Sequence, residues 1–206
     1  ASSSPGGLLI ADSTGVKPGK TKRGSPLNLA MKVTGREVKG KRAGLKKELV
    51  TLSVGKWRED ELRGVQADLG ITDGEPELKG VMARTQPGLP SQRCLFHAQR
   101  DLYWALYRDG AEGERAHWEE RLVGELWKPS AKGMAGVDRL IAELDLRRLH
   151  SAATYLRNAR EELFTVTRLK EQGVAPELVM VATSPVEREF REINRRTEVG
   201  ARWTDE

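Results

Sequence analysis

The order of two hydrophobic periodicities along this chain limits its possible folds more than any other feature. Residues 8–17, 27–35 and 49–55 are apolar runs or alternate between apolar and polar positions, as β-strands do. From residue 98 to about residue 172, every periodic segment has helical spacing, with a break at residues 128–136. Short strand and helix patterns alternate between these two blocks. The chain therefore predicts a mixed α/β sheet that is followed by an all-helical block.

The segments between and after these blocks complete the order of elements. They predict a helix at 59–70 that stops at Gly70, a short strand at 71–74, a helix at 75–85, a fifth strand at 92–97 and a last helix at 184–196. Val186, Phe190 and Ile193 give the last helix one apolar stripe. This order is the ribonuclease-H-like arrangement, a mixed five-stranded sheet with an all-α insertion before the last helix.

The same pattern predicts the domain organisation. We expect a linker at 1–7, the first part of the core at 8–97, the all-α insertion at 98–182 and a C-terminal helix at 183–206 that completes the core. The chain starts at Ala1 with a Ser/Gly-rich stretch, which is typical of a piece of a longer protein. It has no run of eighteen apolar residues, so we expect a soluble cytoplasmic protein. It has a single cysteine, so we expect no internal disulfide.

Basic residues are concentrated at the start of the chain. Residues 1–47 contain eleven Lys or Arg residues and only two acidic ones, within a chain whose net charge is +5. A concentrated basic field suits a polyanion such as nucleic acid, because each neutralised phosphate releases counterions. Lys-rich hairpins that are merely solvated are the alternative.

Two aspartates come at the ends of predicted strands, which makes them candidate metal ligands. Asp12 follows "LLIA" and Asp73 follows "GIT", so neighbouring strands would bring both carboxylates to adjacent positions. Glu187 of the last helix could join them, and three carboxylates suffice for a pair of Mg²⁺ ions that act on a phosphodiester. Each acid also has an ordinary explanation. Both aspartates could start turns, and Glu187 could form a capping box with Ser184.

Four stretches, "IADSTGVK", "ITDGEPEL", "CLFHAQRDL" and "TSPVEREFREINRRTEVGARW", resemble the catalytic core of Mutator-type insertion-sequence transposases and related prokaryotic DDE transposases. The resemblance implies that Asp12, Asp73 and Glu187 are the catalytic acids and hold two Mg²⁺ or Mn²⁺ ions. Glu189 and Glu192 are then helix-surface residues. Ser13, and Ser184 with Pro185, differ from residues that are frequent in the family.

The activity implied is metal-dependent DNA cleavage and strand transfer at element ends. The implied partners are terminal inverted repeats and target DNA, bound by a homodimer in the nucleoid of a prokaryotic cell. A nuclease that only hydrolyses DNA, and a catalytically silent DNA-binding protein derived from a transposase, are the alternatives.

Charge and resemblance together predict a set of residues that contact DNA. They are Lys17, Lys20, Lys22, Arg23, Lys41, Arg42, Arg100, Arg188, Arg191 and Arg195. Cys94 and His97 form a Cys-x-x-His resembling one found in this superfamily, and we expect Cys94 in the core and His97 near the active site. A structural zinc site would need four ligands, which the remaining histidines do not supply. Three tryptophans, Trp104, Trp118 and Trp127, are expected to fill the core between helices rather than to stack on unpaired bases.

Overall fold

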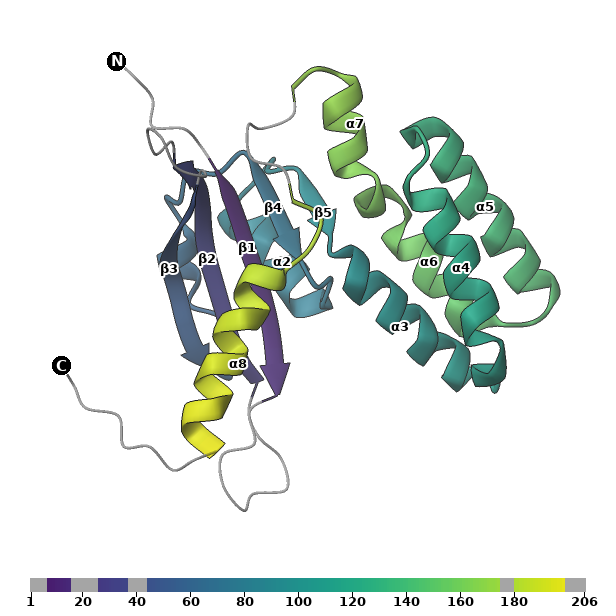
Figure 1. The fold of residues 1–206 in the computed structure, drawn as a ribbon, viewed down its shortest axis with the longest axis horizontal. Helices are drawn as coiled ribbons and strands as arrows, with labels where there is room; N and C mark the ends of the chain where they lie inside the picture. Colours follow the sequence, from purple (N-terminus) through teal and green to yellow (C-terminus); the bar gives the residue numbers. More distant parts are fainter. Residues whose placement is uncertain (1–6, 16–25, 37–43, 175–179, 199–206) are drawn as a thin grey trace. The chain divides into compact units, whose positions relative to one another are not determined.

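The computed structural model of the chain describes residues 7–15, 26–36, 44–174 and 180–198. Over these residues the protein is a mixed α/β structure whose five-stranded sheet contains parallel and antiparallel pairs (Figure 1). The mixed sheet predicted from the sequence is therefore confirmed. The chain divides into two compact units, one formed by Ala1–Leu89 with Thr183–Glu206 and the other by Pro90–Ala182.

Three consecutive antiparallel strands and a fourth strand parallel to the first belong to the first unit, and the fifth strand belongs to the second unit. The strands are β1 (Leu8–Gly15), β2 (Pro26–Arg36), β3 (Gly44–Val54), β4 (Leu69–Thr72) and β5 (Ser91–Arg93), in the sheet order β3-β2-β1-β4-β5. The antiparallel pairs β1–β2 and β2–β3 form a meander of three consecutive strands. β4 runs parallel to β1, with Leu8 opposite Leu69 and Ala11 opposite Thr72. β1 thus lies between β2 and β4.

Helices belong to both units. Those of the first unit are α1 (Glu59–Leu62), α2 (Pro76–Thr85) and α8 (Ser184–Glu198). The described part of the second unit contains α3 (Leu95–Arg108), the 3-10 turn η1 (Glu112–Glu114), α4 (Arg115–Leu126), α5 (Ser130–Leu146), α6 (His150–Leu163) and α7 (Thr165–Glu171). No helix among the described residues is long and apolar enough to cross a membrane.

Helices pack against β1 in the first unit, which explains its unbroken apolar sequence. Residues 8–11 are fully buried, as expected of a strand that is covered on both faces. Leu9 packs in one cluster with Leu78 of α2. Helix α8 packs on β1 and β2 and crosses in front of them in Figure 1, burying Val186 and Phe190. The apolar stripe predicted for the last helix therefore faces the sheet.

The second unit has a hydrophobic core of its own. Trp118 and Leu122 of α4 are fully buried together with Leu106 of α3, Leu144 of α5 and Phe164 at the end of α6. Arg121 and Arg147 lie over the Trp118 ring, at 4.9 and 5.6 Å from its centroid. Long amphipathic helices with one apolar side each account for this bundle.

The helix predicted at 59–70 is wrong beyond its first turn. Helix α1 ends at Leu62, Gly64 has a φ of +84°, and Gly70 lies inside β4 instead of ending a helix. The backbone N–H of Asp68 donates to the Gly7 carbonyl at 2.8 Å, and the Asp68 carboxylate accepts from the Gly7 N–H at 2.9 Å. These contacts with a residue 61 positions away hold the segment beside β1, which its local periodicity does not reveal.

The break predicted at 128–136 is shorter than expected, because α5 begins at Ser130. The Ser130 backbone N–H donates to the Glu171 carboxylate at 2.8 Å, and the Ser130 hydroxyl donates to the same carboxylate. Glu171 lies at the end of α7, so it satisfies this helix start from a distant part of the sequence. The predicted fifth strand at 92–97 is also shorter, since β5 ends at Arg93 and α3 begins at Leu95.

Candidate functional site

Two of the predicted acids lie side by side at the edge where β1 and β4 meet. The parallel register of the strands runs up to Ala11 opposite Thr72, and the next residues are Asp12 and Asp73. Asp73 directly follows β4, as predicted, whereas Asp12 lies inside β1, which continues to Gly15. The exposed fractions of the two residues are only 3% and 6%. The sheet register therefore buries two carboxylates in adjacent positions.

Backbone and hydroxyl donors fix the Asp73 carboxylate. One of its oxygens accepts from the Ser13 N–H at 3.3 Å and from the Ser13 hydroxyl at 3.4 Å. The other accepts from the Glu75 N–H at 3.0 Å. Glu75 in turn caps α2 by accepting from the Leu78 N–H at 2.8 Å. The Ser13 side chain thus donates a hydrogen bond that glycine at this position could not donate.

Helix α8 brings the third acid to the same place. It begins at Ser184, and the Thr183 carbonyl accepts its first hydrogen bonds, from the Val186 N–H at 2.9 Å and the Glu187 N–H at 3.1 Å. The predicted capping box of Ser184 and Glu187 is therefore wrong, since Thr183 holds the cap position. The Thr183 hydroxyl donates to the Glu187 carboxylate at 3.2 Å. Glu187 is half-buried at the first turn of α8.

The carboxylates of this group interact strongly. Burial, the neighbouring charge of Asp73 and a hydrogen bond with Asp73 raise the pKa of Asp12 to about 8. The Glu187 charge raises this pKa further, while a hydrogen bond with Thr183 lowers it. The structure thus brings Asp12, Asp73 and Glu187 together within the first unit. Asp12 holds a proton at neutral pH in this arrangement.

The chemistry of these donors fits a hard divalent cation. Three carboxylates from a strand, a strand end and a helix supply only oxygen ligands, which Mg²⁺ and Mn²⁺ prefer. A cation would also relieve the repulsion that raises the pKa of Asp12. Asp12, Asp73 and Glu187 are the residues of the first unit that could hold it.

Cys94 and His97 belong to the second unit, whereas the three acids belong to the first. Cys94 is fully buried immediately before α3, as expected of a core residue. His97 is buried on α3. Its expected place near the active site stays a prediction.

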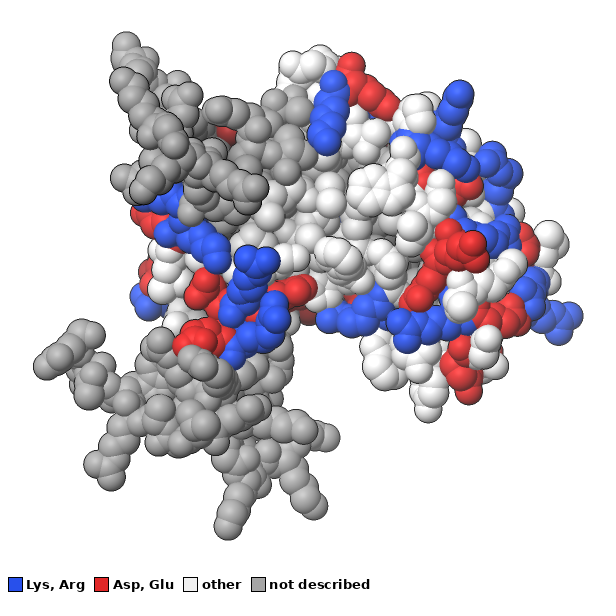
Figure 2. Space-filling view, in the orientation of Figure 1, with Lys and Arg blue, Asp and Glu red and all other residues white. Residues whose placement is uncertain are grey.

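The predicted DNA-contacting residues are only partly described. Lys17, Lys20, Lys22, Arg23, Lys41 and Arg42 lie outside the described residues, as does the side chain of Arg195. Arg188 and Arg191 are exposed on α8, and Arg100 is exposed on α3, where it pairs with Asp101 at 2.9 Å. Basic and acidic side chains are interspersed over the face that Figure 2 shows. Lys47 of β3 forms a surface ion pair with Glu189 of α8 at 3.1 Å.

The expectation for the tryptophans is correct for one of the three. Trp118 is fully buried, but the exposed fractions of Trp104 and Trp127 are 49% and 74%. Trp104 has an exposed aromatic neighbour, Tyr107, at 5.9 Å between ring centroids. The helical spacing of these residues does not distinguish the core side of a helix from its outer side.

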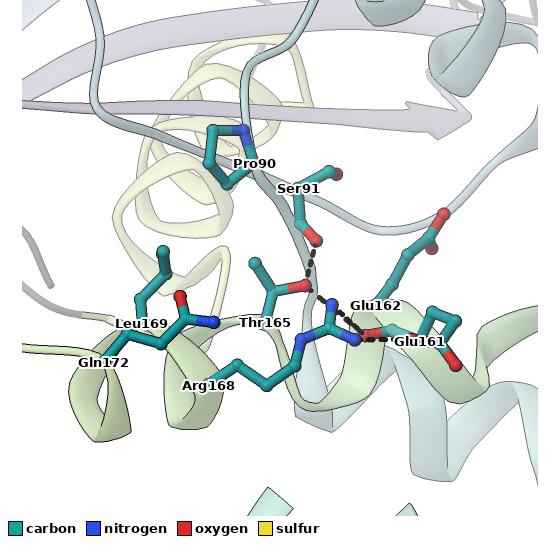
Figure 3. Close-up of a pocket in the computed structure, with 8 residues that line it drawn as sticks. All are labelled: Pro90, Ser91, Glu161, Glu162, Thr165, Arg168, Leu169 and Gln172. Atoms are coloured by element: carbon teal, nitrogen blue, oxygen red, sulfur yellow. Dashed lines mark hydrogen bonds and ion pairs between the residues drawn. The ribbon is translucent and has the colours of Figure 1, made fainter. Parts of the chain in front are cut away.

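A pocket of about 290 Å³ lies within the second unit, beside β5 and α7 (Figure 3). The Thr165 hydroxyl at its wall donates to the Ser91 carbonyl at 2.7 Å, and Arg168 pairs with Glu161. Figure 3 shows these polar groups directed at one another. None of the three acids lines this pocket.

Sequence reasoning missed three residues that shape the acidic site, Ser13, Glu75 and Thr183. Each lies within four residues of a candidate acid, and this closeness in sequence was the available signal. Comparison of the chain with protein-family models and with curated proteins finds no match.

Proposed function

We propose that this chain is the catalytic domain of a DDE transposase, with Asp12, Asp73 and Glu187 as the acids that hold the metal ions. The observation that carries the proposal is the convergence of these three carboxylates from β1, from the end of β4 and from the first turn of α8. Oxygen donors in this number suit two Mg²⁺ or Mn²⁺ ions.

The element order supports a ribonuclease-H-like core. An antiparallel meander of β1, β2 and β3, followed by a β4 strand parallel to β1, is the order expected of that fold. Residues 90–182 form a separate helical unit between the parts of the chain that make the first unit, as an insertion would. The resemblance of residues 183–203 to Mutator-type transposases adds the proposed family.

The residues of the site have different roles in the proposed reaction. Divalent ions at such a site activate water or a 3'-hydroxyl and stabilise the leaving oxygen of a phosphodiester. Asp12 would have to lose its proton to serve as a ligand, because only the carboxylate form binds a cation well. The Ser13 and Glu75 N–H groups hold the Asp73 carboxylate in one orientation. Helix α8 supplies Glu187 and carries Arg188 and Arg191, whose exposed charges suit DNA phosphates.

Strand transfer is favoured over the alternatives by two features. All three acids are present and contact one another or a shared partner, which argues against a catalytically silent protein. The motif around Glu187 resembles transposases rather than nucleases that only hydrolyse. The proposed partners are element ends and target DNA, bound by a homodimer in a prokaryotic cell.

A joining assay tests the proposal. Duplex oligonucleotides with free 3'-hydroxyl ends are incubated with a supercoiled plasmid, the protein and Mg²⁺ or Mn²⁺, and joined and nicked products are separated. We expect metal-dependent joining that Asp12→Asn and Asp73→Asn each abolish. Nicking without any joined product would favour the hydrolytic nuclease, and neither product with either metal would favour the silent protein.

A further inference from the structure

Thr183 lies between two of the acids. Its residue type alone does not reveal this position. It is fully buried, it directly precedes α8, and its carbonyl accepts the first two backbone hydrogen bonds of that helix. Its hydroxyl lies 3.2 Å from the Glu187 carboxylate and also hydrogen-bonds with the side chain of Asp12. One hydroxyl therefore links an acid on β1 to an acid on α8.

This link has a physical consequence for the longer of the two side chains. A glutamate on the first turn of an exposed helix end has three side-chain torsions and samples many rotamers. The Thr183 hydroxyl donates one hydrogen bond at a time and can accept others, so it contacts both carboxyl groups at once when one of them is protonated. Because Thr183 is held by the backbone of α8 and by burial, it restrains Glu187 on the side of Asp12.

We propose that Thr183 is a positioning residue that pre-orients Glu187 toward Asp12 for binding a divalent cation. The inference rests on the proposed metal site and adds a residue that is not itself a ligand. Groups that orient a metal ligand through a hydrogen bond change metal affinity by about 10- to 100-fold when they are removed. The hydroxyl of Thr183 carries this effect, and its methyl group and backbone carbonyl serve the fold.

Mn²⁺ binding to the purified protein, measured by calorimetry and by the loss of the free-ion electron paramagnetic resonance signal, tests the inference. Thr183→Val keeps the size, the burial and the backbone carbonyl but removes the hydroxyl, and we expect it to bind Mn²⁺ about tenfold more weakly or worse. Thr183→Ser restores a hydroxyl and is expected to bind within about threefold of the wild type. If valine prevents folding, the difference between Thr183→Ser and Thr183→Ala isolates the hydroxyl instead.

Thr51 on β3 offers a matched control in the same unit. It is also a buried threonine, with an exposed fraction of 1%, and its hydroxyl has no hydrogen-bond partner among the residues that the structure describes. Thr51→Val should leave Mn²⁺ affinity unchanged. A general effect of deleting a buried hydroxyl would weaken both valine variants equally, and that result would overturn the inference.

The outcomes separate this inference from the proposed function. If Mn²⁺ binding survives Asp12→Asn and Asp73→Asn, or is absent from the wild type, the metal site and the role of Thr183 fall together. If both aspartate variants lose Mn²⁺ while Thr183→Val binds like the wild type, only the role of Thr183 is wrong. Equally weak binding by the serine and valine variants would also contradict the role of the hydroxyl.

Discussion

Asp12 is a buried carboxyl group, and its surroundings disfavour its negatively charged form. Burial, the charges of Asp73 and Glu187 and a hydrogen bond with Asp73 raise its pKa, while a hydrogen bond with Thr183 lowers it. Most buried acids in proteins are paired with a cation or with several N–H donors. A buried carboxyl group surrounded by other carboxyl groups is instead typical of sites that bind a cation or take part in proton transfer.

This charge balance predicts how the stability of the metal-free protein depends on pH. The pKa of Asp12 is about 8 in the folded protein and near 3.8 in the unfolded chain, so the folded state binds more protons between these values. The stability of the protein should therefore fall as the pH rises from about 5 to about 8. The lowered pKa values of Asp109 and Glu114 affect stability only at more acid pH. Thermal unfolding measured across this range should show the decline in the wild type and a much flatter profile in Asp12→Asn. Mg²⁺ should raise the Tm of the wild type most at the alkaline end.

The glutamates of α8 should differ sharply in their effect on catalysis. Glu187→Gln still accepts the Thr183 hydroxyl hydrogen bond through its amide oxygen, so the fold should persist, but the neutral amide is a poor Mg²⁺ ligand. We expect DNA cleavage and joining to be lost. Glu189→Gln removes the Lys47 ion pair, which is worth roughly 0.2–1 kcal/mol at this exposure, and should keep most activity. An active Glu187→Gln or an inactive Glu189→Gln in the joining assay would show that the third acid is misassigned.

At the scale of elements, the sequence predicts what local patterns encode and misses what distant contacts decide. The strands β1 and β2, helix α2 and helix α8 follow from periodicity and turn residues, and Asp73 follows from its place at a strand end. The start of α5 depends on Glu171, and the end of α1 depends on the pairing of Asp68 with Gly7. The cap of α8 was misplaced by one residue, because Thr183 and Ser184 are both good capping residues and only the backbone hydrogen bonds distinguish them.

Helix α5 packs so closely in the helical unit that one of its glycines has no room for a side chain. A Cβ at Gly133 would lie 2.7 Å from the Glu125 carbonyl oxygen and would overlap the Phe164 ring. Gly133→Ala should therefore destabilise the protein by about 1–3 kcal/mol, although alanine favours a helix by about 1 kcal/mol over glycine.

Gly124 of α4 is the matched control for this substitution. A Cβ there meets nothing within 4 Å, so Gly124→Ala should stabilise the protein by about 0.5–1 kcal/mol. Urea unfolding followed by circular dichroism measures both variants. Equal stabilisation by the two substitutions would mean that α5 does not approach Phe164 as closely as the structure has it.

At the scale of the whole molecule, the proposed function places demands on the distribution of charge. The chain has a net charge of +5, and its basic excess lies in residues 1–47, the part of the sequence that also supplies Asp12. Mutual repulsion among three carboxylates would by itself keep DNA away from the acidic site. Cations at the site and basic side chains around it are thus both required if phosphates are to approach.

The salt dependence of DNA binding should identify the basic residues that contact phosphates. Arg188 and Arg191 are exposed on α8 within about one turn of Glu187, so they are well placed to neutralise phosphates next to the acids. Each phosphate contact contributes about 0.9 to the slope of log K against log salt concentration. The double variant Arg188→Ala with Arg191→Ala should therefore bind duplex DNA more weakly and reduce the slope by roughly 2, measured by fluorescence anisotropy between low and physiological salt.

Arg139→Ala removes an equally exposed charge from α5 and should leave the slope unchanged. A slope that is the same in the double variant and the wild type would exclude α8 from the DNA interface, and a loss confined to Arg139→Ala would move that interface to the helical unit.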